Sequence, residues 1–143
     1  MNPHETILLS ARSLQQALSR KQMKTIFIVD DSPTILLSVS AILTKAGYAV
    51  EKASNGQDAL ARFRGGIKAD LLITDLNMPG MNGLELIKEV RQLPNYRFMP
   101  ILFLTTESQQ ARRAEARAAG ASGWLVKPAS ADDLLNTIKL VLR

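Results

Sequence analysis

The chain has 143 residues, 46% of them hydrophobic, and its 18 Lys and Arg residues outnumber 13 Asp and Glu residues to give a net charge of +5. It contains no cysteine, which excludes a disulfide framework, a cysteine-based zinc site and a thiol nucleophile, and no apolar run approaches the roughly 20 residues of a membrane-spanning helix. Aromatic residues make up only 5% and the positive charges are scattered, so we expect a cytoplasmic globular protein that binds neither nucleic acid nor a membrane.

Residues 1–23 stand apart from the rest of the chain. Apolar residues recur at helical spacing at Ile7, Ala11, Leu14 and Leu18, which indicates a short amphipathic helix, although a disordered extension fits the same residues. We therefore treat residues 1–23 as an N-terminal extension and residues 24–143 as the folded domain.

From Lys24 onward, apolar runs typical of β-strands alternate with stretches whose apolar residues recur at helical spacing. The predicted strands cover residues 25–29, 48–53, 71–74, 100–105 and 124–126, and the predicted helices carry apolar stripes at residues 35–43, 59–63, 84–90, 108–118 and 134–142. Short connections between alternating strands and helices require a parallel sheet with helices on both faces. We predict a doubly wound α/β fold of the flavodoxin-like kind, with five strands in the order 2-1-3-4-5.

The helix predicted over residues 108–118 is rich in alanine. We expect Ala111, Ala114 and Ala118 to face the core. Alanine buries little surface, so this packing would be thin and the helix could shift at low cost. The low side-chain entropy of an ordinary alanine-rich helix explains the same residues.

Polar residues mark the ends of four predicted strands. Asp30 and Asp31 follow the first strand, Asp75 the third and Lys127 the fifth, while Thr105 ends the fourth. Because the carboxyl ends of parallel strands meet at one edge of a sheet, we expect these side chains to lie close together. Three neighbouring carboxylates need a cation or raised pKa values, and oxygen ligands without His or Cys suit Mg²⁺. The set is typical of an aspartate that receives a phosphoryl group while a metal and a lysine absorb charge.

Each of these residues also has an ordinary structural explanation. Asp75 could be a turn residue and Asp31 part of the cap of the following helix. Thr105 could be a strand residue with β propensity, and Lys127 a surface lysine before a turn. Their arrival on the same edge of one sheet is what favours a functional site.

The motifs at these strand ends resemble those of bacterial response-regulator receiver domains, most closely the stand-alone chemotaxis CheY type. The resemblance covers residues 24–143. It rests on Val29-Asp30-Asp31-Ser32, on residues 75–83 (DLNMPGMNG), on Leu104-Thr105-Thr106-Glu107 and on residues 119–128 (AGASGWLVKP).

The resemblance implies a role for each matching residue. Asp75 would be the phosphoacceptor, and Asp30 and Asp31 would hold Mg²⁺ together with Asp75 and the backbone carbonyl of Asn77. Lys127 would bind the phosphoryl group. The peptide bond between Lys127 and Pro128 would be cis.

Further roles concern the lifetime of the phosphoryl group and the switch. Thr105 would hydrogen-bond the attached phosphoryl group and move toward it. Asn77 and Glu107 match positions that tune spontaneous hydrolysis, and their residue types imply a labile mark. The aromatic residue that turns inward with Thr105 would be Trp124, where the family usually carries Tyr or Phe. A tryptophan packed at a strand edge is the structural alternative.

One further departure is Ala129 after Pro128, where many relatives place Phe. The other motifs agree with the family.

The leading functional hypothesis is a signalling module that accepts a phosphoryl group from a histidine kinase or phosphotransfer protein. We expect a monomer, not an enzyme in the usual sense, that promotes its own phosphorylation and dephosphorylation. Its output would be protein contact through the helix at residues 108–118, the last strand and the last helix. By analogy the target would be the flagellar motor switch. The alternative within the family is a stand-alone phosphorelay intermediate or phosphate sink without a motor target.

Two other classes fit the fold less well. An aspartyl-phosphate hydrolase needs a second Asp two residues after the nucleophile as general acid, and Asn77 occupies that place. A flavodoxin-like cofactor carrier needs a phosphate-binding loop after the first strand, where Asp30 and Asp31 would repel phosphate.

Overall fold

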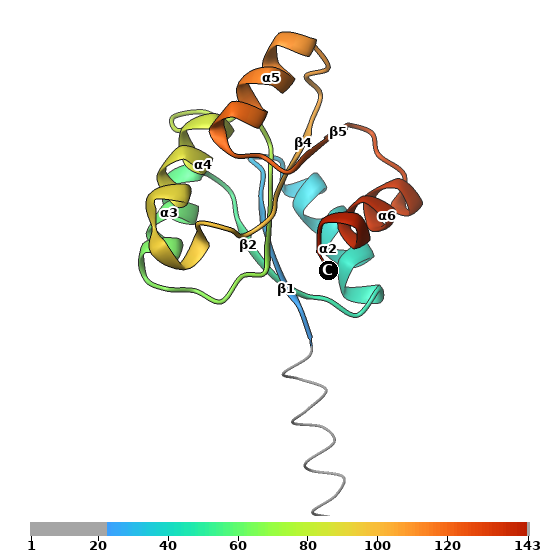
Figure 1. Cartoon of the computed structure of the whole chain (residues 1–143). Coiled ribbons are helices and arrows are strands. Elements are labelled where there is room, and N and C mark those ends of the chain that lie inside the picture. Colours follow the sequence, from blue (N-terminus) through green and yellow to red (C-terminus); the bar gives the residue numbers. More distant parts are fainter. Residues whose placement is uncertain (1–22, 143) are drawn as a thin grey trace, which may run out of the picture.

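The predicted strands form one open parallel sheet in the computed structural model, which describes residues 23–142 (Figure 1). The strand order is β2-β1-β3-β4-β5, so the predicted topology is confirmed. The three central strands are buried throughout, as expected for runs covered on both faces. The strands are β1 (Thr25–Val29), β2 (Ala49–Ala53), β3 (Leu71–Thr74), β4 (Ile101–Thr105) and β5 (Gly123–Val126).

Helices cover both faces of the sheet. In Figure 1, α2 and α6 lie on one side and α3, α4 and α5 on the other, and each group packs on its own apolar cluster of the sheet. The helices are α2 (Pro33–Lys45), α3 (Gly56–Arg64), α4 (Gly83–Gln92), α5 (Gln110–Ala119) and α6 (Ala131–Val141), and a short 3-10 helix, η1 (Pro94–Tyr96), follows α4.

Side chains at the helix N-termini fix where most helices begin. The Oγ of Ser32 accepts a hydrogen bond from the backbone N–H of Ile35, and Pro33 takes the first helical position of α2, as the sequence predicts. Asn82 and Glu85 form a capping box at the start of α4. The N-cap of α5, Gln109, makes no such hydrogen bond. Its first turn therefore lacks the stabilisation that the other α-helices have.

The prediction of which α5 residues face the core is wrong. Ala111, Ala114 and Ala118 are exposed, whereas Ala116 is buried and Ala119 is half-buried against the cluster of the α3 side. Alanine lies on every side of this helix, so its position in the sequence does not select a face. The expectation of thin packing is nevertheless met, because Ala116 is the one buried residue of α5.

The hypothesis of an N-terminal amphipathic helix falls on residues outside the described part of the chain, and the domain boundary near residue 24 remains a prediction. Within residues 23–142, no helix is long and apolar enough to cross a lipid bilayer.

Candidate functional site

The carboxyl ends of β1, β3 and β5 bring three of the predicted residues into contact. Val29 and Thr74 are register partners, so Asp30 and Asp75 leave adjacent strands at the same level. The Nζ of Lys127, directly after β5, lies 2.6 Å from Oδ2 of Asp30 and 3.4 Å from Oδ2 of Asp75. The lysine thus bridges two carboxylates, and its side chain is only 14% exposed. Lys127 is therefore not an ordinary surface lysine before a turn.

Asp31 completes a cluster of three carboxylates. One oxygen each from Asp30, Asp31 and Asp75 lies within 4.8 Å of the others. Asp30 and Asp75 are buried, whereas Asp31 is exposed. The cap of α2 is Ser32, whose own N–H donates to Oδ1 of Asp30 at 2.9 Å. Asp30, rather than Asp31, therefore contributes to the turn that precedes α2. Asp31 is the solvent-exposed member of the cluster.

The charges of the cluster do not balance. Three carboxylates (−3) and one ammonium (+1) leave a formal charge of −2. Burial raises the pKa of Asp30 above its ordinary value, and the nearby Asp75 adds to that rise. The hydrogen bonds from Lys127 and from the N–H of Ser32 oppose it. Burial is the main cause of the raised pKa and repulsion from Asp75 a minor one, and a cation bound at this edge would favour the charged form of Asp30.

The oxygen donors fit a magnesium ion. Mg²⁺ takes oxygen ligands, usually one or two carboxylates with waters and a phosphate, and the cluster offers three carboxylates with no nitrogen or sulfur ligand. Asn77 lies three residues after the end of β3 and is exposed. The role of its backbone carbonyl as a ligand stays a prediction.

Backbone contacts hold Asp75 in place. Its Oδ1 accepts the N–H of Leu76 at 2.8 Å, and its carbonyl oxygen accepts the hydroxyl of Thr74 at 2.9 Å. The first residue of α4, Gly83, approaches so closely that a Cβ there would lie 2.2 Å from the carbonyl oxygen of Asp75. Sequence reasoning gave Gly83 no role beyond its place in the motif. The sequence feature that could have identified Gly83 is a glycine at the start of a helix, directly after an asparagine N-cap.

Thr105 lies at the end of β4, fully buried. Its Oγ1 accepts the N–H of Glu107 at 3.3 Å, and its carbonyl oxygen accepts the N–H of Lys127 at 2.8 Å. Glu107 in turn accepts the N–H of Gln109 through Oε1 at 3.0 Å. Thr105 is thus tied to the segment that carries Lys127. The Lys127–Pro128 peptide bond is cis, as expected.

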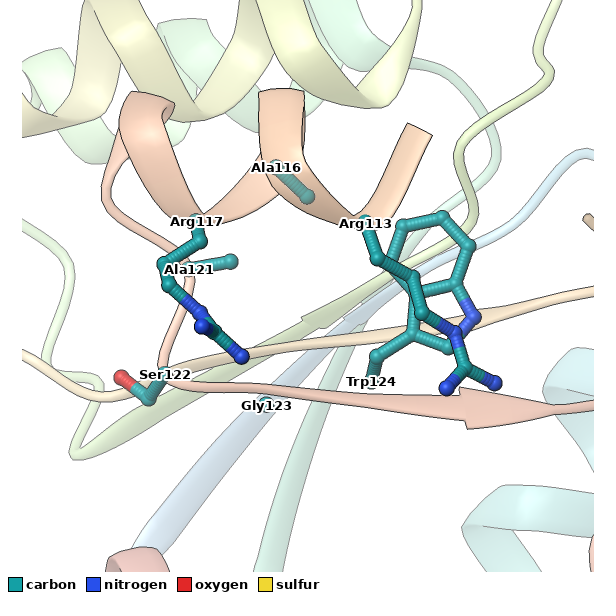
Figure 2. Close-up of a pocket in the computed structure, with 7 residues that line it drawn as sticks. All are labelled: Arg113, Ala116, Arg117, Ala121, Ser122, Gly123 and Trp124. Carbon is teal, nitrogen blue, oxygen red and sulfur yellow. The ribbon is translucent and has the colours of Figure 1, made fainter. Parts of the chain in front are cut away.

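Trp124 packs against the core from β5. Its ring lies 5.4 Å from that of Phe103, its register partner on β4, and the guanidinium of Arg113 lies 5.9 Å from the ring (Figure 2). In the described part of the chain, its buried Nε1 has no hydrogen-bond partner. Burying an indole N–H without a partner costs about 1–3 kcal/mol. Packing explains the position of the ring, but it leaves this unsatisfied donor unexplained.

Comparisons with known proteins agree with the geometry. The family model described as response regulator receiver domain matches residues 26–139. The chain is 37% identical over 120 residues to protein PilH of Pseudomonas aeruginosa, covering 84% of this chain and 98% of PilH. It is 36% identical over 118 residues to chemotaxis protein CheY1 of Helicobacter pylori, covering 82% and 95%. The structure of chemotaxis protein CheY4 of Vibrio cholerae superposes with a TM-score of 0.81 at 46% identity, covering 84% and 99%.

Proposed function

Because the chain belongs to the response regulator receiver domain family of two-component systems, we propose that Asp75 accepts a phosphoryl group from a histidine kinase or phosphotransfer protein. The observation that carries this proposal is the position of the Lys127 ammonium, 2.6 Å from Asp30 and 3.4 Å from Asp75 in a cluster of three carboxylates. A lysine placed in this way can bind an oxygen of a phosphoryl group on Asp75.

The transfer forms one bond and breaks another. A carboxylate oxygen of Asp75 bonds to phosphorus, the P–N bond of the donor phosphohistidine breaks, and the imidazole nitrogen keeps the electron pair and takes up a proton. Mg²⁺, when bound by Asp30, Asp31, Asp75 and the backbone carbonyl of Asn77, supplies positive charge for the phosphoryl oxygens.

Two of the chain's own residues would then serve the phosphorylated state. Lys127 neutralises charge on the phosphoryl group, and the Thr105 hydroxyl donates a hydrogen bond to it. In the present structure this hydroxyl accepts the N–H of Glu107, which leaves its proton available for the phosphoryl group.

Loss of the phosphoryl group needs only water. Water attacks phosphorus, the bond between phosphorus and the Asp75 oxygen breaks, and inorganic phosphate leaves. Asn77 is exposed three residues after the end of β3, and Glu107 is half-buried two residues after the end of β4. We propose that they set the lifetime of the acyl phosphate, and that the domain promotes these reactions only on itself.

The output is contact with a target protein. We propose that Thr105 and Trp124 shift together on phosphorylation and alter the face formed by α5, β5 and α6. The thin packing and uncapped start of α5 support this, because little burial has to be broken to move it. The similarity to chemotaxis proteins supports the flagellar motor switch as the target. We propose that the protein carries out this function as a monomer in the cytoplasm.

Intact mass spectrometry with a small phosphodonor such as acetyl phosphate tests the proposal. Wild-type protein is expected to gain one phosphoryl group in the presence of Mg²⁺ and to lose it with time. Asp75→Asn should gain none, whereas the exposed control Asp132→Asn should behave as wild type. A stable adduct on Asp75→Asn would show that another residue is the phosphoacceptor. No adduct on the wild type with either acetyl phosphate or a cognate kinase would refute the proposed chemistry.

A further inference from the structure

An apolar groove runs between α2 and α6, which lie on the same side of the sheet in Figure 1. Two pockets of about 460 and 430 Å³ form it, and Ile42 of α2 lines both. Val39, Leu104 and Leu134 are buried at the larger pocket. Ala129 also lines this pocket and contributes only a methyl group. We call this surface the α2–α6 groove.

The walls of the α2–α6 groove are only partly buried. Ile35, Ile42 and Leu135 pack on the apolar cluster of this side of the sheet and are half-buried. The two lysines of the groove belong to different pockets, Lys127 to the larger one and Lys45 to the smaller one. A continuous apolar surface between polar ends is typical of a site that another chain segment covers.

The sequence before the described domain carries an apolar stripe. On a helix with 100° per residue, the stripe falls within about 60° of the circumference. It consists of Ile7, Ala11, Leu14 and Leu18. The polar residues Glu5, Arg12, Gln16 and Arg20 fall on the opposite side of the same helix. Residues 1–22 therefore have the pattern of a helix that buries one narrow face.

The same stretch has a helix start signal. Asn2, Pro3 and Glu5 occupy the N-cap, the first and the third helical positions of a capping box. Asn82 and Glu85 have this spacing at α4, where the structure shows both hydrogen bonds of the box.

We propose that residues 1–22 form an amphipathic helix that docks in the α2–α6 groove of the same chain. The place where the segment joins the domain supports this. The carbonyl of Lys24 accepts the N–H of Ala49 at 2.9 Å, and Ala49 follows by three residues Ala46, which lines the smaller pocket. Residues 19–23 would connect the helix to β1, a length within the usual two to six residues or so of such connections.

The stripe and the groove also agree in length. The lining residues of α2 run from Ile35 to Ala46, and the stripe runs from Ile7 to Leu18. Both spans correspond to about 16 Å of helix. Leu18 would then lie at the smaller pocket and Ile7 at the larger one. A segment tethered this closely has an effective concentration of about millimolar or more, which favours it over a second copy or a separate partner. This docking goes beyond the proposed function and does not depend on it.

Disulfide formation in the full chain tests the inference, and the absence of native cysteine leaves introduced pairs without competitors. Ala11→Cys is combined with Ser38→Cys, which lines the larger pocket from an exposed position on α2. A disulfide requires the two Cα atoms to come within about 7 Å. The control pair is Ala11→Cys with Lys88→Cys, at an exposed position of α4 on the other side of the sheet. We expect the Ser38 pair to form a disulfide within one chain at least about tenfold faster than the control pair.

Two further variants of the Ser38 pair test the stripe itself. Leu14→Asp should slow the disulfide at least about tenfold, because it removes an apolar side chain from the contact and adds a charge. Gln16→Asp makes the same change of charge on the opposite side of the helix and should leave the rate within about twofold. Both substitutions precede residue 23, so the sheet and its helices keep their own residues.

Several outcomes would overturn the inference. These are equal rates for the Ser38 and Lys88 pairs, an unchanged rate with Leu14→Asp, or equal slowing by Leu14→Asp and Gln16→Asp. Intact mass under non-reducing conditions distinguishes the other occupants. A disulfide found only between two chains would assign the groove to the segment of a second copy, and no disulfide at all would leave the groove to a separate partner.

Discussion

Gly83 is where a single methyl group should damage both the fold and the phosphoryl site. A Cβ on this residue would lie 2.2 Å from the carbonyl oxygen of Asp75 and 2.6 Å from Cε1 of Phe103. Ordinary van der Waals contact for a carbon and an oxygen needs about 3.4 Å or more. Gly83→Ala therefore requires a movement on the order of 1 Å, either of the start of α4 or of the backbone of Asp75.

The cost follows from the contacts that this movement strains. Overpacking a tight site costs about 1–3 kcal/mol. The carbonyl oxygen of Asp75 also accepts the hydroxyl of Thr74 at 2.9 Å, and the N–H of Gly83 donates to the carbonyl of Leu76 at 2.9 Å. Loss of one such hydrogen bond adds about 1 kcal/mol. Alanine in place of glycine returns about 0.4–1 kcal/mol through the unfolded state, so the net loss should be about 1–3.6 kcal/mol.

Urea unfolding and phosphodonor kinetics measure the two effects. Gly83→Ala should lower the free energy of unfolding by the amount above and slow adduct formation on Asp75 by tenfold or more, because a displacement of about 1 Å can cost on the order of a hundredfold in rate. The matched control is Gly65→Ala at the end of α3, where the Cβ would meet only the Arg62 carbonyl at 3.4 Å and the Ala61 carbonyl at 3.5 Å. It should change stability by less than about 1 kcal/mol. If both variants have the same stability and the same rate, the close approach at Gly83 is not what holds Asp75.

Three further predictions concern the metal, a buried hydroxyl and the switch. Mg²⁺ at a hundred times its Kd should raise the free energy of unfolding of the wild type by about 2.7 kcal/mol. This increase should vanish in Asp30→Asn and persist in Asp132→Asn. An equal increase in both variants would show that the metal binds elsewhere. Burial raises the pKa of Tyr96 above 10.0, so its neutral hydroxyl stabilises the fold below pH 10 and that contribution is lost as the pH rises through the raised pKa. Tyr96→Phe should cost about 1 kcal/mol at pH 7 in urea unfolding and flatten the decline above pH 10, and an unchanged alkaline slope would contradict this. Acetyl phosphate with Mg²⁺ should change the fluorescence of Trp124 in the wild type but not in Asp75→Asn; an adduct without a spectral change would show that the indole does not take part in the switch.

The topology could be predicted from the sequence because two periodicities were unambiguous there. Central strands with three or four consecutive apolar residues are typical of burial on both faces, and stripes such as Ala59, Leu60 and Phe63 place α3 on the sheet. The 3-10 helix η1 escaped prediction because three residues carry no period, although Pro94 marks its start.

The face of α5 could not be predicted for a different reason. With Ala111, Ala114, Ala116, Ala118 and Ala119 distributed around the helix, hydrophobicity barely distinguishes its sides. Its orientation is set instead by the partners that it meets, including Trp124 beneath Arg113. A pattern rule fails where all candidate positions carry the same small residue.

At the site, strand ends could be predicted but distances could not. The sequence placed Asp30, Asp75 and Lys127 on one edge, since a parallel sheet requires it. That Lys127 lies closer to Asp30 than to Asp75 depends on the turn after β5 and on rotamers, which no residue pattern encodes. The close approach of Gly83 is likewise a tertiary contact, visible only when α4 is set against β3.

The position of Lys127 has a consequence for how the resting and phosphorylated states would differ. One ammonium now serves two carboxylates and lies nearest to Asp30, whose burial already raises its pKa. A phosphoryl group on Asp75 would carry more charge than the carboxylate it replaces and would extend farther from β3. Lys127 cannot then stay closest to Asp30 without leaving the larger charge unneutralised. If it moves, Asp30 becomes a buried carboxylate without its lysine, a state that costs several kcal/mol unless another cation replaces it. Phosphorylation should therefore increase the dependence of this edge on a metal ion.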